Sequence, residues 1–67
     1  MIRYEVQLKR LGEYRMLFNI FSEYHIMNIN RKYEGRTSII SFAVSRANSK
    51  EVEERLKESR LISKVSE

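Results

Sequence analysis

The chain of 67 residues contains no cysteine and no proline, and His25 is its single histidine. Without cysteine there is no disulfide framework, thiolate metal site or cysteine nucleophile. Small secreted domains usually need such cross-links, so we expect a reducing, cytoplasmic location. The chain also lacks aspartate. A metal site would need several ligands converging on His25, and a serine nucleophile would need a base and its orienting group. We therefore expect no catalysis, cofactor or metal.

Long hydrophobic runs are also missing. The first ten residues, MIRYEVQLKR, alternate in polarity instead of forming the apolar block of a signal peptide, and no segment is long enough to span a membrane. The length fits one domain, residues 1–67, near the lower limit for a self-sufficient core. The last predicted strand ends close to the end of the sequence, so we expect a domain excised from a larger protein.

The periodicity of the apolar residues divides the chain into six segments. The expected elements are strand 2–8, helix 13–24, strand 25–33, strand 37–45, helix 48–60 and strand 61–66. Gly35 supplies the positive φ of a tight turn with Glu34. Asn48 is expected to cap the second helix in a capping box with Glu51. The polar strand 25–33 is typical of a sheet edge.

The order strand, helix, strand, strand, helix, strand predicts a ferredoxin-like α+β sandwich. Two helices then cover one face of a four-stranded antiparallel sheet, with the first and third strands in the centre. The apolar stripe of the first helix is expected to pack into the core; it comprises Tyr14, Leu17, Phe18, Phe21 and Tyr24. The second helix is expected to bury Val52 and Leu56 and to carry ion pairs at helical spacing. These pairs are Glu51 with Arg55 and Glu53 with Lys57.

The other face of the sheet is expected to be mostly polar and wet. Its residues on the two central strands are Arg3, Glu5, Gln7, Ile39, Ser41 and Ala43. RNA-binding domains of this fold stack bases on aromatic side chains at this face, and none is present here. A nucleic-acid partner is therefore not favoured.

The net charge of +4 comes from 13 basic and 9 acidic residues and suits acidic partners. The predicted topology gathers basic residues at the end where the first helix begins, namely Lys9, Arg10, Arg31, Lys32, Arg36 and Arg60. Together with the helix N-terminus they form a candidate anion site. The alternative is a solvated charged rim that keeps the domain soluble.

Two stretches carry a resemblance to a known family, Lys9-Arg10-Leu11-Gly12 and the segment 18–29, FNIFSEYHIMNI. This rhythm resembles the ACT domain, a regulatory module of small-molecule sensors with the same order of elements. The resemblance implies an amino-acid site between paired domains, formed by Arg10 and Gly12 in the first loop and by Asn28 and Ile29 at the second strand. Two residues depart from the family pattern: Lys9 stands where a residue that accepts the ligand's amino group is expected, and Leu11 replaces the usual proline. A cation at position 9 would repel an ammonium group.

The chain also resembles the ACT-like tails that follow the membrane helices of MgtC/SapB-type proteins. Both resemblances imply a non-catalytic regulatory or assembly domain of a larger, perhaps membrane-bound, protein. Such a domain would sense a small ligand, either an amino acid or an anion, or mediate self-association as a homodimer. The alternative is a nucleic-acid or anion-binding module that uses the basic end.

Overall fold

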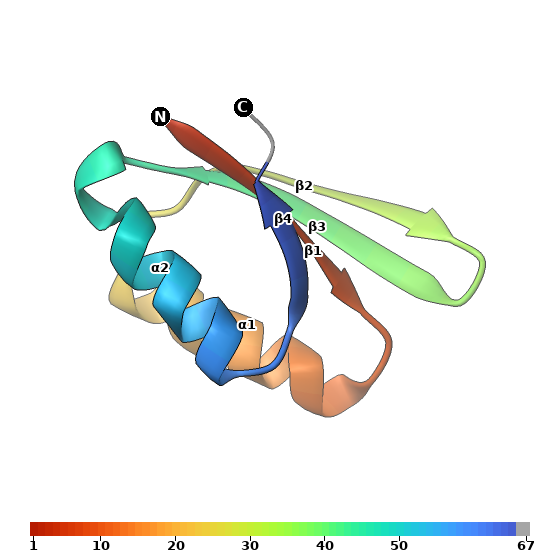
Figure 1. Ribbon diagram of the computed structural model, residues 1–67. Coiled ribbons are helices and arrows are strands. Elements are labelled where there is room, and N and C mark those ends of the chain that lie inside the picture. Colours follow the sequence, from red (N-terminus) through yellow and green to blue (C-terminus); the bar gives the residue numbers. More distant parts are fainter. Residues whose placement is uncertain (66–67) are drawn as a thin grey trace.

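The computed structural model describes residues 1–65 of the chain, and the last residue of the predicted strand 61–66 lies outside that range. The elements follow the predicted order (Figure 1). They are β1 (Ile2–Leu8), α1 (Leu11–Glu23), β2 (Met27–Glu34), β3 (Thr37–Val44), α2 (Arg46–Glu58) and β4 (Ile62–Val65).

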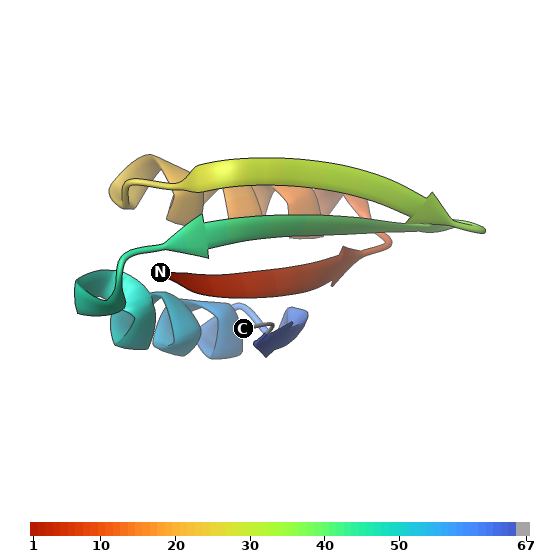
Figure 2. The ribbon, with the colours of Figure 1, turned by 90° about the horizontal axis from the view of Figure 1, so that it is seen from above.

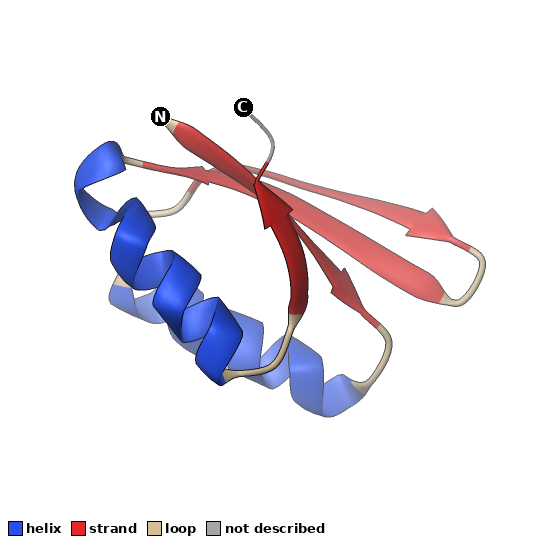
Figure 3. Cartoon of the chain, in the orientation of Figure 1, coloured by secondary structure: helices blue, strands red, loops and turns tan. Residues whose placement is uncertain are grey.

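The four strands form one antiparallel sheet in the order β2-β3-β1-β4. Both helices lie on one face of this sheet (Figure 3). Seen from above the sheet, α1 lies beneath the β2 side and α2 beneath the β4 side (Figure 2). This is the predicted ferredoxin-like α+β arrangement, with the two most apolar strands, β1 and β3, in the centre.

The core lies between the sheet and the helices. Phe42 of β3 is at its centre, with its ring centroid 4.8 Å from that of Phe21 and 5.8 Å from that of Tyr4. Val52 and Leu56 of α2 are buried, as predicted. In α1 the fully buried residues are Leu17 and Ile20. Tyr14, Phe21 and Tyr24 are partly buried and pack against the core, as predicted. Phe18 is the exception in the predicted stripe, because it is 48% exposed.

The predicted cap of the second helix is wrong. Helix α2 begins at Arg46, and Ser45 is its N-cap without a side-chain hydrogen bond to the helix. Asn48 lies inside the first turn, where its N–H donates to the carbonyl of Ser45 at 3.1 Å. Ser45 already has the extended conformation of a cap (φ −65°, ψ 154°). Strand β3 therefore passes directly into α2 with no loop between them.

The predicted ion pairs along α2 are also replaced by contacts to other elements. Arg55 pairs with Glu23 at the end of α1 instead of with Glu51. Glu53 accepts a hydrogen bond from the hydroxyl of Tyr4, at 3.2 Å. Contacts between packed elements thus replace the predicted pairs within the helix. The sequence could not predict this, because helical spacing alone does not show which face of a helix meets a neighbouring element.

The open face of the sheet is drier than predicted. Ile39 is 7% exposed and Ala43 is 4% exposed, although both belong to the face without helices. The guanidinium of Arg3 lies across this face and donates to Ser41 Oγ at 3.2 Å and to the carbonyl of Asn28 at 3.3 Å. Long polar side chains lying flat on a sheet can cover small apolar ones with their methylene groups.

Candidate functional site

The N-terminus of α1, expected to attract an anion, already holds a carboxylate of the chain. Glu13 Oε1 accepts hydrogen bonds from the backbone N–H groups of Lys9, at 2.8 Å, and Arg10, at 2.9 Å. These two bonds, with the positive charges of the same residues, hold the pKa of Glu13 below its usual value. The carboxylate therefore stays ionised at neutral pH and competes with any anion arriving at this helix end.

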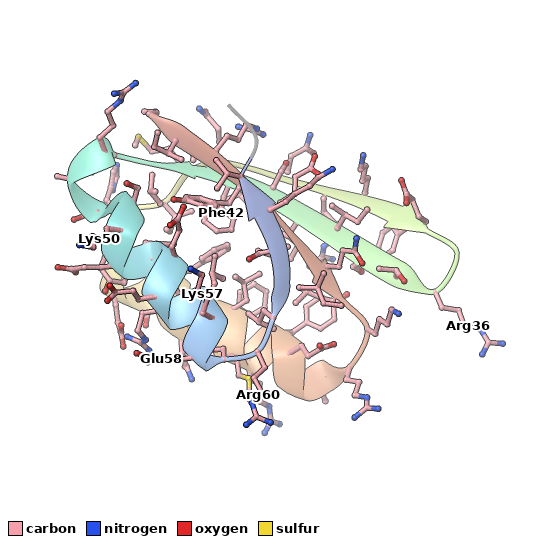
Figure 4. The ribbon with its side chains drawn as sticks, viewed as in Figure 1. Arg36, Phe42, Lys50, Lys57, Glu58 and Arg60 are labelled. Carbon is pink, nitrogen blue, oxygen red and sulfur yellow. The ribbon has the colours of Figure 1, made fainter. Side chains whose placement is uncertain are left out.

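The six basic residues of the predicted anion site do not share one surface. The register pairs Arg31 with Ile40, which faces the helices, and Lys32 with Ile39, which faces away from them. Arg36 projects from the tip of the β2–β3 hairpin, and Arg60 lies beyond the end of α2, far from that tip (Figure 4). Lys9 and Arg10 precede α1. Within one chain these residues form a loose rim around one end of the sheet.

The four residues carried over from the ACT resemblance lie in two separate places. Arg10 and Gly12 stand at the start of α1, just after β1 ends. Asn28 and Ile29 stand near the start of β2, and the carbonyl of Asn28 is bonded to Arg3 at the beginning of β1. The two pairs therefore lie at opposite ends of β1 and do not form one site within a single chain.

A shallow groove of about 180 Å³ crosses the open face of the sheet. Its lining comprises Glu5, Gln7, Lys32, Glu34, Ile39, Ile62, Ser63 and Lys64. Lys64 and Glu5 form an ion pair across it, at 3.3 Å. Charges of both signs alternate over an apolar floor, so the groove has no strong preference for one charge.

The exposed edge of β2 is the most distinctive surface of the domain (Figure 2). Glu34 pairs with Thr37 across a two-residue turn, and Gly35 has the positive φ, 63°, that such a turn requires. The closing pair of such a hairpin is hydrogen-bonded, so alternate residues direct their N–H and C=O groups to the partner strand. The backbone groups of Arg31 and Tyr33 therefore point away from β3.

A bulge ends the regular part of this edge. Met27 pairs with Ala43 and Asn30 with Ser41, so β2 contains one extra residue between them, and Asn28 has a φ of 53°. At the next outward position, the N–H of Arg31 donates to Oδ1 of Asn30 at 2.9 Å. Bulges and local side-chain caps of this kind limit edge-to-edge pairing. The regular part of this edge thus runs from Asn30 to the turn, and its outward-facing residues are Arg31 and Tyr33.

The side chain of Arg31 is held against the helix-covered side of this edge. Its guanidinium lies 5.9 Å from the ring centroid of Tyr14 and donates to the hydroxyl of Tyr33 at 3.2 Å. The Tyr14 hydroxyl donates in turn to Ser38 Oγ, so Tyr14 is anchored to β3. Arg31 makes no ion pair within residues 1–65. The exposed guanidinium of Arg31 thus contacts two tyrosines and no carboxylate in this part of the chain.

Sequence reasoning did not identify Tyr14 and Tyr33 as parts of this surface. Ile29 and Tyr33, on the helix-covered side of β2, are 58% and 66% exposed. Arg31 lies between them, at the same two-residue spacing. That alternation within a polar strand was the available signal, because residues two apart share one face of a strand.

The described helices include none that is long and apolar enough to cross a membrane. No protein-family model matches the sequence, and no curated protein matches it. Solved structures do match. One of them is titled "De novo designed protein Foldit4". It superposes on this chain with a TM-score of 0.63 at 10% sequence identity, and the match covers 97% of this chain and 90% of the designed one. At this identity the likeness shows the fold alone.

Proposed function

We propose that this chain is a non-catalytic, ACT-like regulatory and assembly domain that self-associates through the edge of β2. The observation that carries the proposal is that this edge combines backbone groups that point away from β3 with two exposed apolar side chains, those of Ile29 and Tyr33. An edge strand of this kind can continue its sheet into a second copy across a two-fold axis.

The other edge of the sheet is less suited to that role. Strand β4 has four residues, whereas β2 has eight. A short edge offers few backbone hydrogen bonds, and proteins use short edge strands to discourage pairing. The bulge and the Asn30 cap restrict the β2 edge without covering it, which suits a reversible contact.

The resemblance to ACT domains and to the tails of MgtC/SapB-type membrane proteins supports a place within a larger protein. In such a setting the rest of the parent chain raises the effective concentration of the domain. A contact that is weakly populated between isolated domains would then be populated to a much greater extent within the larger protein.

The test is sedimentation velocity over a wide dilution series. We expect a reversible equilibrium in which the average mass falls toward the 8.1 kDa monomer on dilution, because formation of a dimer depends on concentration. A chain that sediments as a monomer at every concentration, up to the highest soluble one, would contradict the proposal.

A further inference from the structure

We infer that the edge of β4 and the neighbouring helix α2 form a binding groove for an extended peptide segment of a partner protein. The peptide that fits this groove has the pattern apolar–any–acidic. Strands β4 and β2 are the two opposite edges of the sheet. Peptide binding at β4 therefore does not depend on self-association through β2 and adds a different partner to the domain.

The register of the sheet shows which backbone groups of β4 face outward. The hydrogen-bonded pair that closes the β2–β3 turn fixes the alternation through β3 and β1, and it makes Glu5 and Lys64 a hydrogen-bonded pair. On either side of Lys64, Ser63 and Val65 therefore direct their N–H and C=O groups away from β1. Within residues 1–65 these outward groups have no hydrogen-bond partner.

A groove of about 230 Å³ lies between this edge and α2. Its lining comprises Tyr4, Glu53, Lys57, Ser63, Lys64 and Val65. The side chains of Ser63 and Val65 are on the helix-covered face of the sheet, because their partners on β1, Val6 and Tyr4, are buried in the core. A peptide residue paired with Ser63 or Val65 directs its side chain to the same face, which places that side chain over the groove.

The groove contains one positive charge that no described carboxylate neutralises. Glu53 accepts a hydrogen bond from the Tyr4 hydroxyl, and Lys64 is in an ion pair with β1. Lys57 forms no ion pair within residues 1–65. A carboxylate held between Lys57 and the hydroxyl of Ser63 could accept hydrogen bonds from both side chains. An acidic residue of the peptide is therefore favoured opposite Ser63.

The positions along the groove set the order of the peptide residues. The chain passes from α2 into β4 through a short turn, so Lys57 lies near the Ser63 end of the groove. Glu53 is bonded to Tyr4, which pairs with Val65. Val65 is 49% exposed and fits an apolar residue of the peptide. Antiparallel pairing then places this apolar residue two positions before the acidic one, because residues two apart share one face of a strand.

The shortness of β4 suits a peptide better than a second folded domain. Its two outward-facing residues offer few backbone hydrogen bonds, so pairing along this edge alone is weak. In peptides that add a strand to a sheet, the backbone bonds contribute affinity and the pockets for alternate side chains contribute specificity. The groove beside α2 supplies such a pocket next to the outward backbone groups.

The test is an NMR titration of the 67-residue chain with the end-capped peptide Thr-Val-Thr-Glu-Thr. We expect saturable shifts of the amides of Ser63, Val65 and Lys57. The reversed peptide, Thr-Glu-Thr-Val-Thr, has the same composition and charge, and Thr-Val-Thr-Gln-Thr lacks the charge. Each should bind about fivefold more weakly, the scale of one exposed ion pair. Equal affinities for the three peptides, or no saturable shift at this edge at millimolar peptide, would overturn the groove.

Two matched variants locate the carboxylate. Lys57→Gln should bind the Glu-containing and Gln-containing peptides with equal affinity. Lys50 lies toward the other end of α2 (Figure 4), and Lys50→Gln should keep the preference for the acidic peptide. Persistence of the preference in Lys57→Gln, or its loss in Lys50→Gln, would overturn the role of Lys57.

Methylation of the peptide backbone tests the strand pairing without changing the protein. In the expected pairing the N–H of the peptide glutamate faces β4, whereas that of the central threonine faces away. Methylation of the glutamate nitrogen should abolish the shifts, and methylation of the central threonine nitrogen should leave them. The opposite result would show that the peptide does not extend the sheet in this register.

Discussion

Replacing Phe42 by alanine should lower the free energy of unfolding by about 3–5 kcal/mol, the usual cost of removing a fully buried phenylalanine. The ring is fully buried on the central strand β3 and contacts Tyr4 and Phe21. A domain of 67 residues has a total stability of roughly 3–10 kcal/mol. Urea unfolding followed by circular dichroism should therefore show a variant whose transition lies at a much lower urea concentration than that of the wild type.

Phe18→Ala is the matched control for that prediction. It removes the same side chain from α1, where Phe18 is 48% exposed. Its ring lies 6.0 Å from that of Phe21 and 6.3 Å from that of Tyr14, at the rim of the aromatic cluster. We expect a loss of about 1 kcal/mol, in line with partial burial. Equal losses for the two variants would contradict the described core.

Replacing Tyr33 by proline should abolish self-association while leaving the monomer folded. The N–H of Tyr33 points away from β3, so proline removes a donor from the free edge and none from the sheet of the same chain. Proline at an edge strand is also a common natural block to pairing. Sedimentation should then give the monomer mass at concentrations where the wild type is dimeric.

Tyr33→Ala separates the contribution of the backbone from that of the side chain. This variant keeps the outward N–H but loses the exposed aromatic surface of Tyr33. We expect dimerisation that is weakened but still measurable. If Tyr33→Pro dimerised as well as Tyr33→Ala, the contact would not involve this edge, and the assembly would have to use another surface.

The fold could be predicted from the sequence because the strongest apolar patterns match the residues that pack into the core. The alternation in 2–8 places Tyr4, Val6 and Leu8 on one face, and all three are buried. The boundaries were harder to predict. Asn48 and Ser45 are equally good capping residues by type, and only Asn48 is followed by a glutamate, Glu51, at capping-box spacing. However, β3 ends at Val44 and leaves Ser45 in the cap conformation. The start of α2 is therefore set by the residue at which the central strand β3 ends, and not by the local capping preference of the sequence.

The site was less predictable than the fold. Arg31 and Lys32 are adjacent in sequence, and their spatial separation depends on which faces of β2 they occupy. The polar run around Asn28 and Asn30 weakens the alternation along β2 and gives no sign of the bulge, so the register of this strand could not be predicted. The role of Glu13 at the start of α1 required the structure too, because its two hydrogen bonds occupy the helix end expected to attract an anion.

The most direct test of the central claim is amide hydrogen exchange measured by NMR at low and high protein concentration. The account predicts that exchange at Tyr33 slows as concentration rises, because this outward N–H becomes bonded to a second copy. The amides of β4, at the other edge, should exchange at the same rate throughout. Concentration-dependent protection at β4 or on the helices, with none at β2, would contradict the account.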